Sequence, residues 1–174
     1  PSNTTLLKLT EILQIVIDWK NAHLRMFIVR DTIYGDPADD EGGFMGALDE
    51  ADSQLSQILQ QEGQKFTYEY DCGDSWYHTL LLEKILSVEE GKDYPGCVTG
   101  KRACPPEDVG GVRGYEDFLK IMRNPRHIEY EDYLAWVGEK FDPEAFDLQA
   151  INNQLRKMGR GRSTQISHAW DMEE

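Results

Sequence analysis

The chain has 174 residues, of which 40% are hydrophobic and 10% are aromatic. This composition suits one globular domain with its own core and excludes a largely disordered chain. The formal net charge is −14, and a surface of that sign repels the phosphates of nucleic acids. No apolar run approaches the roughly 18 residues that span a bilayer, and the start at Pro1 carries no export leader. We therefore expect a cytoplasmic protein without membrane contact. Three cysteines, an odd number, suit a reducing compartment.

The first part of the chain predicts alternating helical and extended elements. Leucines and isoleucines at three- and four-residue spacing predict an amphipathic helix that Thr4 or Thr5 can cap. β-Branched and aromatic residues then predict a strand, and a Gly-Asp-Pro turn signal ends a short return strand. These elements cover residues 4–19, 23–29 and 31–37, followed by an acidic loop at 37–43 and a short helix at 53–60 that Gly63 ends.

Residues 66–86 predict a β-hairpin around Gly73 and Asp74. A two-residue turn with glycine first would pair Asp71 with Trp76 and Glu69 with His78. A four-residue loop closed by Asp71 and Trp76 keeps the same register. Because side chains alternate between the faces of a strand, either loop places these two acids, Trp76 and His78 on one face.

This predicted face has two interpretations. Acids beside His78 would raise its pKa, and a histidine with carboxylates can act as a general base or hold a divalent metal. The structural alternative is cross-strand charge pairing, which stabilises a sheet by roughly 0.2–1 kcal/mol per pair. The candidate catalytic residues are His78, Asp71 and Asp74, which are also the candidate metal ligands. No metal or other cofactor is assigned.

The second half of the chain predicts a long irregular segment and three helices. Residues 89–114 are rich in proline and glycine without periodicity, and long segments of this kind are often functional. The helices are expected at 115–123, 129–141 and 143–158. The basic run from Arg156 to Arg162 is typical of a helix C-terminus with a flexible exit. A nucleic-acid contact is expected only there, if anywhere.

The three cysteines do not predict a structural zinc site. Cys97 and Cys104 are too far apart for the usual paired spacing, and Cys72 would point away from His78. We expect three inert thiols.

Several stretches together resemble the uncharacterised family named after the third open reading frame of an Ri plasmid. They are TTLLKLTEILQIVIDWKNAHLRMFIV, YGDP, FTYEYDCGDSWYHTLLLEKIL, YPGCVTGKRACPPEDVGG with GYEDFLKIM, and FDPEAFDLQAINNQL. They cover residues 2 to 156 in one colinear run. The family's Y-D-F-G-D-x-W-x-H hairpin is matched, except that Cys72 replaces phenylalanine. Its A-C-P-P-E-D-x-G-G element is matched from Ala103 to Gly111.

The resemblance implies an α+β fold, with a mostly antiparallel sheet packed by helices and a C-terminal helical segment. It implies no established activity. Family members usually begin with an apolar strand, and because the sequence starts just after that point we expect one sheet strand to be absent. Residues 159–174 match no known part of the family. We therefore expect a single domain over 1–158 and a mobile tail over 159–174. A resolvase-like label used for some relatives would require a nucleophilic serine among arginines and a helix-turn-helix, which are not evident here.

These observations favour a binding or interaction domain for an unknown protein or small ligand, rather than an enzyme. Its surface would be the hairpin face with Trp76 and His78, covered by the Cys104–Asp108 loop, whose prolines would present Glu107 and Asp108. The alternative is a metal-dependent hydrolase or nuclease in which a divalent ion is surrounded by His78, Asp71, Asp74, Glu107 and Asp108. A third hypothesis is a plasmid- or DNA-associated factor that uses residues 156–162.

Overall fold

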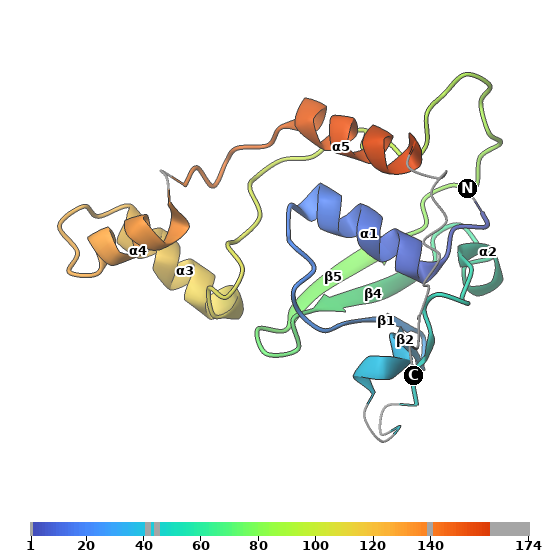
Figure 1. The fold of residues 1–174 in the computed structure, drawn as a ribbon, viewed down its shortest axis with the longest axis horizontal. Coiled ribbons are helices and arrows are strands. Elements are labelled where there is room, and N and C mark those ends of the chain that lie inside the picture. Colours follow the sequence, from blue (N-terminus) through green and yellow to red (C-terminus); the bar gives the residue numbers. More distant parts are fainter. Residues whose placement is uncertain (1, 41–42, 44–45, 139–140, 161–174) are drawn as a thin grey trace, which may run out of the picture.

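The computed structural model describes residues 2–40, 43, 46–138 and 141–160, and it shows a five-stranded sheet with helices (Figure 1). The strand order is β3-β2-β1-β4-β5. Only β2 and β3 run parallel, and the other neighbours are antiparallel. The predicted α+β fold is confirmed. The strands are β1 (Arg25–Val29), β2 (Thr32–Gly35), β3 (Leu48–Asp49), β4 (Lys65–Tyr70) and β5 (Trp76–Leu81).

The first helix, α1 (Leu6–Ile17), packs against the sheet and builds the core with it. Thr5 caps the helix by accepting a hydrogen bond from the backbone N–H of Lys8. Inside the interface, Gln14 Nε2 donates to the hydroxyl of Tyr68 at 3.0 Å and the hydroxyl of Thr10 donates to Glu50 at 3.2 Å, so these buried polar groups are satisfied. The buried residues around it are Leu6, Trp19, Phe27, Val29, Leu59, Phe66, Tyr68 and Tyr70, with Leu59 following the short helix α2 (Leu55–Ile58).

The register predicted for the hairpin was wrong by one residue. Tyr70 pairs with Trp76, and Tyr68 pairs with His78. The cause is Asp71, whose carboxylate accepts hydrogen bonds from the N–H groups of Gly73 and Asp74 and so closes a five-residue loop over 71–75. A shift of one residue moves every following side chain to the other face. Trp76 and His78 therefore share the core face with the tyrosines, away from Glu69.

The three C-terminal helices are present, with shifted boundaries: α3 (Gly111–Met122), α4 (Tyr130–Val137) and α5 (Leu148–Arg160). Helices α3 and α4 pair through Phe118, whose ring contacts Tyr133 and Trp136, and in Figure 1 they lie to one side of the sheet. Helix α5 lies beside α1 and buries Ile151 and Leu155. Most of the predicted tail, residues 161–174, lies outside the described residues. None of the described helices is long and apolar enough to cross a membrane.

Candidate functional site

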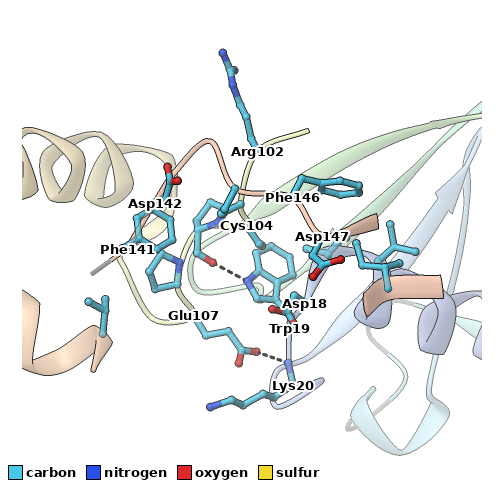
Figure 2. Close-up of a pocket in the computed structure, with 18 of the residues that line it drawn as sticks. Asp18, Trp19, Lys20, Arg102, Cys104, Glu107, Phe141, Asp142, Phe146 and Asp147 are labelled. Carbon is cyan, nitrogen blue, oxygen red and sulfur yellow. Dashed lines mark hydrogen bonds between the residues drawn. The ribbon is translucent and has the colours of Figure 1, made fainter. Parts of the chain in front are cut away.

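The hairpin loop and the segment over residues 104–111 lie against each other, although thirty residues separate them in the chain. Asp74 Oδ2 accepts a hydrogen bond from the N–H of Gly110 at 3.0 Å. Gly111 lies so close to the loop that a Cβ atom there would be 2.6 Å from the carbonyl oxygen of Asp74. On the other side, Trp19 Nε1 donates to the carbonyl of Pro105 at 2.9 Å (Figure 2). Only glycine at position 111 allows the close approach between this residue and the carbonyl oxygen of Asp74.

One histidine lies between two acids at this junction. His23 Nδ1 is 3.6 Å from Asp71 Oδ2, and His23 Nε2 is 3.3 Å from Asp108 Oδ1. Both aspartates have left-handed backbone conformations, with φ of 56° and 61°. Such strain in residues other than glycine is often associated with functional sites. The sequence did not point to His23, because its partners come from distant segments and a histidine before a strand has no local signature.

A second pair of side chains, Tyr70 and Glu107, connects the same two segments. The hydroxyl of Tyr70 donates to Glu107 Oε1 at 2.6 Å and accepts from the N–H of Ala22 at 3.0 Å. The N–H of Lys20 also donates to Glu107 Oε1, at 3.3 Å (Figure 2). Burial raises the pKa of Tyr70, and the hydrogen bond to Glu107 raises it further. Tyr70 therefore stays protonated and works as a hydrogen-bond donor.

A cleft of about 810 Å³ opens in front of this junction, between the end of α1 and the C-terminal segments. Four aromatic residues line it, and its charged residues are mostly acidic (Figure 2). The aromatic residues are Trp19, Trp136, Phe141 and Phe146. The acids are Asp18, Glu107, Asp108, Asp142 and Asp147, against Lys20 and Arg102, with His23 beside them.

The candidate residues of the hairpin lie in three different places: Trp76 and His78 in the core, Asp71 beside His23, and Asp74 against Gly110. Trp76 and His78 pack behind Trp19, with ring centroids 5.8 and 5.4 Å from it, and do not themselves line the cleft. The predicted pairing of His78 with acids was wrong: its Nδ1 is buried and has no hydrogen-bond partner in the described part of the chain. Burial lowers the pKa of His78 rather than raising it.

The acids proposed with His78 are also divided among separate contacts. Asp71 and Asp108 meet at His23, Asp74 holds Gly110, and Glu107 holds Tyr70. A metal site made of all five predicted residues therefore does not assemble, although two of them do converge. Which of these residues bind a ligand remains a prediction.

The cysteines are free thiols, and Cys72 is exposed at the hairpin tip. Burial, followed by the nearby acids Asp18 and Glu107, raises the pKa of Cys104. This thiol therefore stays protonated and is a poor nucleophile.

The basic run is only partly described. Arg156 lies on α5 and contacts Asn153, while residues 161 and 162 fall outside the described residues.

Comparison with known proteins shows which family this chain resembles. Residues 1–150 match the family described as plasmid pRiA4b ORF-3-like protein. The uncharacterized protein y4hQ of Sinorhizobium fredii is 34% identical over 157 residues, which cover 89% of this chain and 79% of that protein. A crystal structure of MM3350, a protein of unknown function from Methanosarcina mazei Go1, is similar with a TM-score of 0.74. The two chains are 39% identical, and the matched region covers 86% of this chain and 84% of MM3350. The chain belongs to the plasmid pRiA4b ORF-3-like family.

Proposed function

We propose that this chain is a binding domain whose cleft takes a cationic ligand with an apolar body, such as an organic amine or a basic peptide side chain. The observation that carries the proposal is the lining of the cleft, which combines five acids, two basic residues and four aromatic rings. Apolar walls with a few placed charges are typical of ligand sites. The acids select the sign of the ligand's charge.

Trp19 is one of the aromatic residues that line this binding site. It is 7% exposed, and it is held by its hydrogen bond to Pro105 and by stacking on Tyr70 at 4.7 Å between ring centroids. A fixed indole offers a face for cation–π contact, which contributes roughly 0.5–2 kcal/mol depending on desolvation. In this proposal Trp76 and His78 support Trp19 from behind, and Glu107 and Asp108 face the ligand.

The test compares two small probes that share a body and differ in charge. We expect 2-phenylethylamine to produce saturable shifts in the amide and indole signals of ¹⁵N-labelled protein, clustered at Trp19 and Trp136, and 3-phenylpropionate to produce none. Raising the salt concentration should weaken binding, since the acids are largely solvated. Equal responses to both probes, or no saturable response to the amine, would refute the proposal.

A charge-matched pair of variants locates the site. Asp18 lines the cleft, is exposed, and has a φ of 69°, which asparagine also tolerates. Asp18→Asn should weaken amine binding about two- to fivefold, the range for one exposed ionic contact. Asp31→Asn removes an exposed acid in the β1–β2 turn, outside the cleft, and should leave the affinity unchanged. Equal affinities for both variants would count against the cleft.

A further inference from the structure

We propose that His23, Asp71 and Asp108 form a site for one divalent transition-metal ion. This inference goes beyond amine binding and does not depend on it. Each residue offers one ligand atom, and these three atoms lie within 4.8 Å of one another. The ligands come from three separate segments: the residues before β1, the hairpin loop and the segment that precedes α3.

The donor set points to the kind of metal. One imidazole nitrogen with two carboxylate oxygens suits Zn²⁺ or Mn²⁺, whereas Mg²⁺ and Ca²⁺ prefer oxygen ligands alone. Structural zinc sites use four protein ligands, while three leave a position open for water or another molecule. Here that position would face the cleft, because His23 and Asp108 both line it.

Two of the three ligands are already oriented. Asp71 uses Oδ1 to accept the hydrogen bonds from Gly73 and Asp74, at 3.0 and 3.2 Å, which leaves Oδ2 directed at His23. The ring of Tyr70 packs edge-on against His23, with 5.8 Å between centroids and an interplanar angle of 85°. Contacts of this kind outside the ligand shell hold metal ligands in position.

The third ligand can supply the movement that binding requires. Metal–ligand bonds of about 2.0–2.2 Å place neighbouring donors roughly 3–3.5 Å apart, so the cluster must contract by about 1 Å. The side chain of Asp108 is 70% exposed, against 13% for Asp71 and 27% for His23. Asp71 faces Nδ1 of His23 and Asp108 faces Nε2, so an ion bound at Nδ1 requires the exposed side chain of Asp108 to move toward that edge of the ring.

The charge of the site also favours a cation. Two carboxylates contribute a charge of −2, on a chain with a formal net charge of −14. A divalent ion would neutralise both carboxylates. The alternative is a metal-free cluster in which His23 contacts both aspartates directly, and such a cluster would not bind a metal ion tightly.

The experiment is calorimetric titration of the full chain, first treated with EDTA, with ZnCl₂ and MnCl₂. We expect one equivalent of at least one of these metals to bind. Asp108→Asn changes an exposed side chain and His23→Gln a partly exposed one, and each should lower the affinity at least about tenfold. Amide spectra of the variants verify that they are folded.

Two matched variants serve as controls. Asp117→Asn and His127→Gln remove the same groups elsewhere: Asp117 is exposed and pairs with Lys120, and His127 is partly exposed and lies near Glu129. Both controls should bind metal as the unmodified chain does. No binding at millimolar metal, or a loss of affinity in only one of the two site variants, would overturn the three-ligand site. Asp18→Asn should retain metal binding, so failure of the amine proposal and failure of the metal proposal are distinguishable.

Discussion

His78 shows how its surroundings change the role of a single side chain. Its ring packs against Trp19 and lies 5.9 Å from the ring of Tyr68, within the aromatic layer between α1 and the sheet. The buried Nδ1 has no hydrogen-bond partner among residues that the structure describes. Because burial disfavours the charged form, the pKa of His78 is lowered. The imidazole behaves as a neutral packing group.

This environment predicts a pH dependence of stability. The unfolded chain binds a proton at His78 near pH 6.5, whereas the folded chain binds it only at lower pH. The free energy of unfolding contributed by this group should therefore fall as the pH drops below about 6.5. His78→Phe retains a ring and removes the titration, so its stability should decline less between pH 7 and pH 5.

Urea unfolding at pH 5, 6 and 7 measures this difference. His127→Gln, at a partly exposed histidine, should follow the unmodified chain. Parallel profiles for the unmodified chain and His78→Phe would show that His78 is not held neutral by the fold.

At the scale of elements, the start of α3 is shaped to fit the hairpin loop. Gly110 donates its N–H to Asp74, and Gly111, with a φ of 67°, lies against the backbone of Asp74. The contact positions the preceding segment, which carries Glu107 and Asp108. The loop and the start of the helix are thus held together, and the positions of Glu107 and Asp108 depend on this contact.

Gly111→Ala should break this joint. The added Cβ would meet a backbone oxygen at 2.6 Å in addition to the positive φ. Gly63→Ala is the matched control, because Gly63 has a φ of 83° and nothing within 4 Å of an added Cβ. We expect Gly111→Ala to lower the free energy of unfolding by about 1–3 kcal/mol more than Gly63→Ala. Chemical denaturation tests this, and equal losses would mean that the close approach to Asp74 costs nothing.

At the scale of the whole molecule, an irregular segment joins the sheet to the C-terminal helices. Residues 83–110 contain neither helix nor strand. Hydrogen bonds at several points along this segment connect it to the rest of the fold. Asn152 on α5 accepts from the N–H of Cys97 at 2.8 Å and donates to its carbonyl at 2.9 Å. Further along, Ala103 donates to the carbonyl of Pro143, and Pro105 accepts from Trp19. These contacts bring the walls of the cleft together.

Asn152→Asp should loosen the connection between the segment and α5. The carboxylate can still accept from Cys97 but cannot donate to its carbonyl, so we expect a loss of about 1–2 kcal/mol in the free energy of unfolding. Hydrogen exchange at Cys97 should speed up correspondingly. Asn153→Asp changes the adjacent, exposed residue and should cost at most about 0.5 kcal/mol. Identical exchange rates in both variants would contradict this role of Asn152.

Local patterns were sufficient to predict the helix that α1 forms and the existence of the hairpin, whereas the α+β class was implied by the family resemblance. The spacing of apolar side chains sets the buried face of a helix whatever it packs against. The helix boundaries were less accurate: α3 begins at Gly111 rather than 115, and α5 at Leu148 rather than 143. The two-residue β3 (Leu48–Asp49) was not predicted, since so short a strand has no period.

The candidate site depended on contacts that no local pattern encodes. The register of the hairpin was decided by Asp71, which bonds to its own loop instead of continuing the strand, and this moved His78 to the core face. The histidine that meets the acids is His23, from a segment with no motif of its own. Side-chain chemistry singled out Asp71 and Asp108 among the acids, but it did not predict that both contact His23. That contact arises only when three distant segments fold together, because proximity in space is a property of packing rather than of spacing along the chain.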